Sequence, residues 1–138
     1  MTYQYILNMV RDTAEAVNPT GHFSHGRNSD AANNPELPYP HIHLYPFNRT
    51  SEPKDHYKKT APLLMYFVEA DTGEQDAEER EGIISRMDTL CTAFIDRLIT
   101  DFENDVEFTN IQDEPQYQIL EGVSGYSLSL TVRGIVSC

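Results

Sequence analysis

Apolar side chains recur at the three- and four-residue spacing of one helix face in two parts of the chain. Over residues 2–17 the repeat is carried by Tyr3, Ile6, Leu7, Val10, Ala14 and Val17. Over residues 77–102 it is carried by Ile83, Ile84, Met87, Leu90, Cys91, Phe94, Ile95, Leu98, Ile99 and Phe102. This spacing predicts an amphipathic first helix and a long second helix that contributes to the core.

Both predicted helices have a recognisable boundary. The first is expected to stop at Asn18-Pro19, because a proline disfavours a helical conformation of the residue before it and removes an amide donor. The second is expected to begin after Asp76, with Glu79 three residues further on in the spacing of a capping box. The neighbouring acids Glu78 and Glu81 suit the positive end of the helix dipole.

Five segments have the composition and alternation of β-strands. They are HIHLYPF (41–47), APLLMYFVEA (61–70), VEFTNI (106–111), QYQIL (116–120) and GYSLSLTVRGIV (125–136). Residues 61–70 are apolar on both faces, which predicts a central strand covered on both sides by helices or by a neighbouring subunit. Between the last two segments, Gly122 and Gly125 are expected to supply the positive φ angles of a tight hairpin turn.

Two polar segments, residues 18–40 and 48–60, are predicted to be long loops. The first is rich in Gly, Asn, Ser and Pro, a composition typical of a segment that orders against a partner. The order of elements indicates a single domain over residues 1–138. Its expected class is α+β, with an antiparallel or mixed β-sheet on which an N-terminal helix and one long helix pack.

The charge and composition of the chain limit the classes of function that we expect. Ten Lys and Arg against 22 Asp and Glu give a formal net charge of −12, so the molecule repels a phosphate backbone and direct nucleic-acid binding is not expected. The N-terminus lacks the basic start and apolar run of a signal peptide, and no segment approaches the roughly 18 apolar residues of a membrane span. A soluble protein made in the cytosol is expected.

Histidines provide the main candidate chemistry. His41 and His43 lie two apart in a predicted strand, so their imidazoles share one face, with Cα atoms about 7 Å apart, and could converge on one metal ion. His22, His25 and His56 could complete a three-histidine zinc centre. The strand contains no carboxylate to serve as acid or base or to orient a ligand. A strand with solvated or interfacial histidines is therefore favoured, with a small metalloenzyme using His41 and His43 as the alternative.

No other motif indicates an enzyme. The sequence has no Gly-rich phosphate loop and no GxSxG elbow, and the acidic run around residues 69–81 does not match the spacing of a calcium loop, so it is read as a solvated helix start. Cys91 lies on the apolar stripe of the second helix and is expected in the core. Cys138 shares no CxxC pair with it, so no disulfide or thiolate metal site is predicted. We expect no catalytic residue, metal or cofactor.

The order of elements resembles the small tail-terminator and head-to-tail joining (neck) proteins of tailed bacteriophages. The resemblance covers most of the chain and is carried by YQYILNMV, PHIHLYPF, PLLMYFVEAD, AEEREGIISRMDTLCTAFIDRLITDF and YQILEGVSGYSLSLTVRGIV. It implies a structural virion protein without catalytic residues. Such a protein forms a ring, typically hexameric, at the tail end or head-tail junction, assembles in the host cytoplasm, and contacts other tail or neck proteins. DNA would pass through its channel without specific binding, and no membrane is involved.

A rotational ring needs two different patches of each subunit to meet. The first helix, the loop 18–40 and the loop 48–60 are the expected interface segments. The individual candidates for subunit contact are Tyr3, Ile6, Val10, His41, His43 and Tyr45. Beside the metalloenzyme, two alternatives stay open: another virion component such as a neck adaptor or a ring protein of a short-tailed phage, and an acidic protein that mimics DNA.

Overall fold

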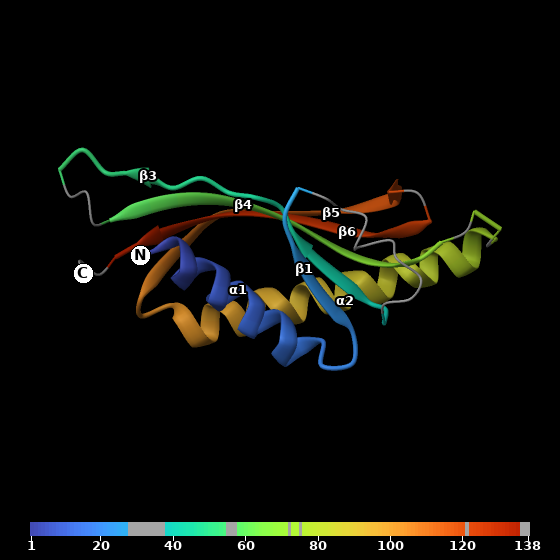
Figure 1. Ribbon diagram of the computed structural model, residues 1–138. Coiled ribbons are helices and arrows are strands. Elements are labelled where there is room, and N and C mark those ends of the chain that lie inside the picture. The colour runs from blue at the N-terminus through green and yellow to red at the C-terminus, as the bar shows by residue number, and fades with distance from the viewer. Residues whose placement is uncertain (28–37, 55–57, 72, 75, 121, 136–138) are drawn as a thin grey trace.

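The computed structural model describes residues 1–27, 38–54, 58–71, 73–74, 76–120 and 122–135, with the backbone alone for 118–120. Along the chain these residues form α1 (Tyr3–Val17), β1 (His22–His25), β2 (His41–Leu44), β3 (Thr50–Ser51), β4 (Lys59–Ala70), α2 (Ala77–Phe102), β5 (Val106–Leu120) and β6 (Val123–Gly134). The strands form one mixed sheet in the order β1-β2-β4-β6-β5, with β3 on β4. Both helices lie on the same side of this sheet (Figure 1). The predicted α+β class is confirmed.

The helix boundaries follow from their caps. Thr2 accepts a hydrogen bond from the Tyr5 amide at the start of α1, and Asn18 ends that helix before Pro19. The Asp76 carboxylate accepts from the Glu79 amide at 2.7 Å, so the predicted start of α2 is confirmed.

Both predicted loops contain a short strand. β1 lies within residues 18–40 and pairs in parallel with β2, and β3 lies within residues 48–60 and pairs with β4. Four and two residues are too short for an alternating pattern to be recognised, and the parallel pairing of β1 joins residues 19 apart, such as His22 and His41. The rest of both segments, residues 28–37 and 55–57, lies outside the described residues.

The predicted strands 106–111 and 116–120 are one continuous strand, β5, which pairs with β6 through two register shifts. Asn110 has a φ of 54° within the first shift, as a residue in a β-bulge can have. Pro115 is compatible with β5 because β5 is an edge strand of the described sheet.

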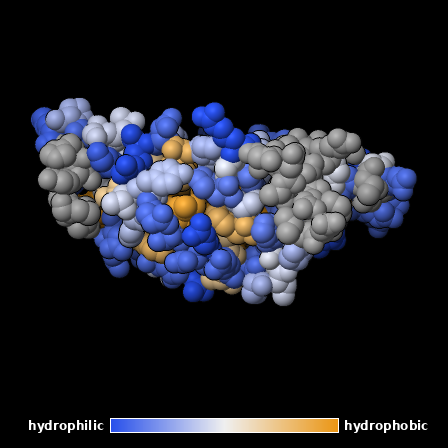
Figure 2. Space-filling view, in the orientation of Figure 1, coloured by the Kyte–Doolittle hydropathy of each residue, from blue (hydrophilic) through white to orange (hydrophobic). Residues whose placement is uncertain are grey.

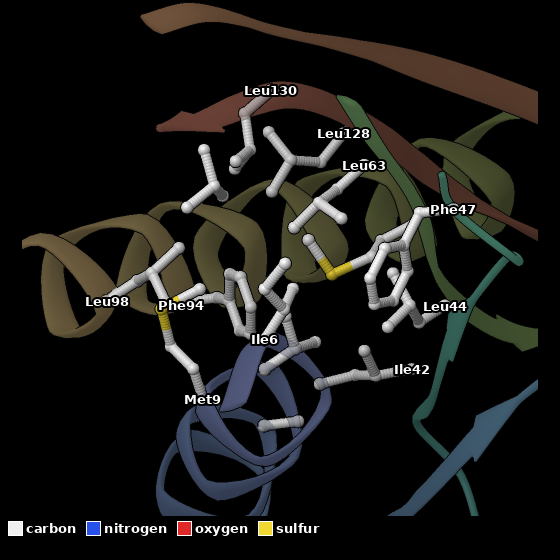
Figure 3. Close-up of a cluster of buried hydrophobic side chains, with 14 of the residues drawn as sticks. Ile6, Met9, Ile42, Leu44, Phe47, Leu63, Phe94, Leu98, Leu128 and Leu130 are labelled. Atoms are coloured by element: carbon white, nitrogen blue, oxygen red, sulfur yellow. The ribbon is translucent and has the colours of Figure 1, made fainter. Parts of the chain in front are cut away.

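The core fills the space between the two helices and one face of the sheet. Figure 3 shows side chains from both helices and from three strands in one cluster, among them Ile6, Met9, Ile42, Leu44, Leu63, Phe94, Leu98, Leu128 and Leu130. Phe67 of β4 meets Phe94 of α2 edge to face, with ring centroids 5.4 Å apart. Full burial of such side chains stabilises the fold by roughly 1.5–3 kcal/mol each.

The two glycines of the predicted hairpin turn serve different purposes. Gly122 has a φ of 85° and lies in the turn between β5 and β6, as predicted. Gly125 instead lies inside β6, where a Cβ atom would stand 1.8 Å from the Phe67 carbonyl oxygen of β4. Only a residue without a side chain permits this approach of the two strands.

Replacement of Gly125 by alanine is expected to lower the free energy of unfolding by at least about 2 kcal/mol, because the backbone of β4 must move away from the added methyl group. Urea unfolding measures the difference. The matched control is Gly82→Ala in α2, where the nearest atom to the added Cβ is the flexible Arg86 guanidinium at 3.3 Å. That variant is expected to gain roughly 0.5–1 kcal/mol. Wild-type stability in Gly125→Ala would contradict the close approach.

Candidate functional site

The sheet has a second face, turned away from the helices, which we call the outer face. Strand register places its residues in rows across neighbouring strands. The row through His43 contains Ser24, Tyr66, Ser127 and Glu114, and the next row contains Tyr45, Leu64, Ser129 and Gln112. Further rows contribute His22, His41, Val68, Gly125 and Gln116 on one side, and Pro62, Thr131 and Thr109 on the other.

Charge is segregated between the two sides of the molecule. Among the outer-face residues just named, Glu114 is the one carboxylate. The exposed surface of the helices, in contrast, carries Asp12, Glu15, Glu78, Glu79, Glu81, Asp88, Asp96 and Asp101. Figure 2 shows that hydrophilic residues cover most of the surface in its view, with apolar residues gathered near the centre. The row beyond Thr131 contains Thr60, Arg133 and Glu107, and Arg133 forms ion pairs with Glu107 and Glu52. Many of the acids thus lie on the helix layer, and the outer face is nearly uncharged only between the His22 and Thr131 rows.

The middle of the outer face is not fully covered. β4 is central in the sheet, as predicted, and Val68 is buried, but Leu64 is 39% exposed and Pro62 is exposed. The expectation that both faces of this strand are covered thus holds only at its Val68 end. Around Leu64 lies a surface pocket of about 590 Å³, lined by Arg27, Tyr45, Pro46, Asn48, Pro62, Leu63, Leu64 and Ser129.

His43 is buried and both of its ring nitrogens are hydrogen-bonded to β1 or the residue after it. Nε2 lies 2.9 Å from the Gly26 carbonyl oxygen, and Nδ1 lies 2.6 Å from the Ser24 hydroxyl. Because a carbonyl can only accept, Nε2 carries the proton and Nδ1 of the neutral ring accepts from Ser24. Burial lowers the pKa of His43, against the effect of the Gly26 hydrogen bond, so the neutral ring is favoured.

The other described histidines also have defined places. His41 is buried, stacks on Tyr39 with ring centroids 4.1 Å apart, and meets His22 edge to face at 5.7 Å. Burial and the neighbouring His41 lower the pKa of His22. On the helix side of the sheet, His25 Nδ1 donates to the Leu44 carbonyl at 3.0 Å and Nε2 accepts from the Tyr3 hydroxyl at 2.7 Å. The imidazoles thus join β1 to β2 and to α1.

A metal centre does not form from these histidines. Within the part of the chain that the structure describes, no group of three or more His, Cys, Asp or Glu side chains could hold a metal ion. His43, one of the two ligands of the metalloenzyme alternative, uses both nitrogens in hydrogen bonds to the chain. His56 lies outside the described residues.

The six candidates for subunit contact differ in accessibility. Ile6, Val10, His41 and His43 are fully buried within the chain, so they contribute to its own packing. Tyr3 is 38% exposed and stacks on Phe47 with ring centroids 4.6 Å apart, and Tyr45 is half-buried in the wall of the Leu64 pocket. These two tyrosines can meet a partner without a change in the fold.

Cys91 is buried in the core as predicted. Burial raises the pKa of its thiol to about 12, and the nearby carboxylates Asp113 and Asp88 act in the same direction. The thiol therefore stays protonated and is a poor nucleophile. Cys138 lies outside the described residues.

Asp71 is a buried ionic site that the sequence did not indicate. It was expected in a solvated helix start, but its side chain is fully buried and accepts hydrogen bonds from Arg80 Nε at 2.7 Å and Nη2 at 3.1 Å, from the Ser124 hydroxyl at 2.5 Å and from the Gly73 amide at 2.9 Å. The Arg80 hydrogen bonds, aided by Ser124 and Gly73, lower its pKa to about 2 although burial opposes this. Partners 9 and 53 residues away give no local sequence signal.

No protein-family model matches this sequence, and no curated protein matches it significantly. None of the helices in the described residues is both long and apolar enough to cross a membrane. The fold defines the chain as an α+β domain with a helix layer on one face of a mixed sheet.

Asp71→Asn is expected to lower the free energy of unfolding at pH 7 by about 2 kcal/mol, from the shift of the carboxyl pKa between 3.8 and about 2. Because the folded pKa is depressed, this contribution is present above pH 3.8 and is lost as the pH falls through about 2. Urea unfolding at pH 7, 4 and 2.5 should show the gap between wild type and variant closing. The exposed Asp101, paired with Arg97, provides the control Asp101→Asn, expected to cost less than about 0.5 kcal/mol. If the difference in free energy of unfolding between wild type and Asp71→Asn stays constant with pH, the ionised Asp71 carboxylate is not its source.

His43 is expected to make the free energy of unfolding depend on pH between about 7 and 5, a higher range than the one in which Asp71 acts. The pKa of His43 in the folded chain lies below the ordinary histidine value of 6.5. Its contribution to stability is therefore fully present above pH 6.5 and is lost as the pH falls below that value. His43→Gln keeps an acceptor for Ser24 and a donor for Gly26 but cannot titrate. Its free energy of unfolding should therefore decrease less than that of wild type between pH 7 and pH 5. If chemical unfolding shows that the free energy of unfolding decreases equally in both proteins, His43 is not the cause of this pH dependence.

Proposed function

We propose that this chain is a structural assembly subunit, a ring-forming virion protein at the tail end or head-tail junction of a tailed bacteriophage. The observation that carries the proposal is the distribution of charge: an acidic helix layer on one side, and on the other an outer face whose middle is nearly uncharged and has an uncovered apolar pocket. A chain of net charge −12 repels its own copies over most of its surface, and the outer face is where that repulsion is smallest.

The order of elements supports the same class. The N-terminal helix, the strand with His41 and His43, the long central strand, the long helix and the closing hairpin occur in the sequence of elements on which the resemblance to tail-terminator and neck proteins rests. In a ring of such subunits, the acidic helix layers would give a channel a negative lining, so that DNA slides through without binding. The remaining partners would be other tail or neck proteins, met on assembly in the host cytoplasm.

Native mass spectrometry of the purified protein tests the proposal. A closed homo-oligomer without bound metal, of about six copies as the resemblance implies, is the expected result. Electron microscopy of the same sample should show rings with a central hole wide enough for duplex DNA. A monomer that binds one zinc ion per chain would overturn the proposal and favour the metalloenzyme, and loss of that zinc in a protein with both His41→Ala and His43→Ala would locate the site.

A further inference from the structure

We infer that the ring closes by a head-to-tail contact in which Tyr117 of one copy enters the Leu64 pocket of the next. The inference rests on the proposed function, and it adds the two surfaces that meet and the residues that anchor them. The contact uses β5 as the donor element and the outer face around β4 as the acceptor.

Tyr117 is the most exposed of the large apolar and aromatic side chains in the described residues, at 51%. Its hydroxyl donates to Glu81 of α2 at 2.6 Å, so Tyr117 lies on the helix side, whereas the preceding Gln116 is opposite Gly125 on the outer face. Tyrosine is among the residues most often found as anchors of protein interfaces, because its ring buries much apolar area for few rotatable bonds. About half of the Tyr117 surface stays exposed within its own chain.

The acceptor is the pocket around Leu64. Its volume of about 590 Å³ can hold an aromatic side chain, and its floor and walls include Leu63, Leu64, Pro62 and Tyr45. The pocket also contains one cation, Arg27. Leu64 is 39% exposed, so an aromatic ring that covered it would remove apolar surface from water on both chains.

The charges around the two surfaces are complementary. Tyr117 follows Asp113 and Glu114 on β5 and bonds to Glu81, whereas Arg27 is the only charged residue among the described residues that line the pocket. This local attraction offsets part of the repulsion between two acidic chains, and it would be absent if two helix layers met. A second copy of the chain therefore fits the pocket better through β5 than through either helix.

The geometry also determines the symmetry. Tyr117 lies on the helix side of the sheet and the pocket lies on the outer face, so one copy cannot offer both to the same partner in a two-fold contact. Such a contact joins unlike patches and repeats from copy to copy, and it closes into a ring when the rotation allows. The two free edges of the described sheet are less suited to this role. β1 has only four residues, and β5 carries a bulge, a proline and acids, which are features that discourage strand addition.

Two variants with complementary defects test the contact. Leu64→Asp damages only the pocket and Tyr117→Ala damages only the donor, so each alone is expected to weaken self-association by at least about 30-fold and to be monomeric in native mass spectrometry. An equimolar mixture retains one intact pair of surfaces, the Tyr117 of the first variant and the pocket of the second. The mixture should therefore form heterodimers that neither variant forms alone.

Two control variants and a second pocket variant complete the test. Tyr117→Phe keeps the ring and loses only the bond to Glu81, so it should assemble like wild type. Thr92→Asp adds the same charge as Leu64→Asp on the exposed side of α2 and should also assemble. Arg27→Glu changes an exposed pocket residue without altering the apolar floor and should weaken assembly, which keeps the test valid if Leu64→Asp unfolds. Circular dichroism verifies the fold of each variant.

The outcomes separate this inference from the proposed function. Rings from Leu64→Asp, Arg27→Glu and Tyr117→Ala, or a mixture that stays monomeric, would overturn the inference and leave a ring-forming protein with another interface. Open filaments of the wild type that are broken by the same variants would support the contact and overturn the closed ring. A wild type that is monomeric at every concentration would overturn both.

Discussion

Packing of α1 and α2 against the same face of the sheet is the constraint on which the rest of the structure depends. The core forms between the helices and the inner side chains of β2, β4 and β6, so most apolar burial is on that side. Val68 and Val123 form a smaller buried cluster with Tyr39 and Tyr66. The outer face receives no helix among the described residues and keeps side chains of a different kind: histidine, tyrosine, serine and threonine, with Leu64 partly uncovered. Because both helices cover the same face of the sheet, the domain has one main core and an outer face that no described helix covers.

Buried polar groups then hold the ends of the strands in place. His43 links β2 to β1 through Ser24 and Gly26, and Asp71 links the end of β4 to α2 and to β6 through Arg80 and Ser124. Each of these groups has hydrogen-bond partners inside the chain, so it contributes to stability by joining neighbouring elements. The histidines that suggested chemistry are therefore part of the architecture.

The separation of charge connects this architecture to assembly. In the proposed assembly, acids on the helix layer would repel other copies. The middle of the outer face, with Arg27, and the exposed ring of Tyr117, with acids nearby, would provide two unlike surfaces. Unlike surfaces on opposite sides of a sheet favour a repeating contact over a two-fold one. The same distribution gives the proposed channel its negative lining.

Local patterns in the sequence determined both helices, the end of the first at Asn18 and the Asp76 cap of the second, the alternation of β2, β4 and β6, and the turn at Gly122, because each depends on residues within a few positions of one another. Only the tertiary structure decided that His22–His25 forms a parallel edge strand, that Gly125 permits close approach to Phe67, and that Asp71 is buried with Arg80 and Ser124. These features join residues far apart in the chain, and their energies come from burial and hydrogen bonding across strands. The pattern along one segment cannot specify them, because it does not say which distant segment will lie beside it.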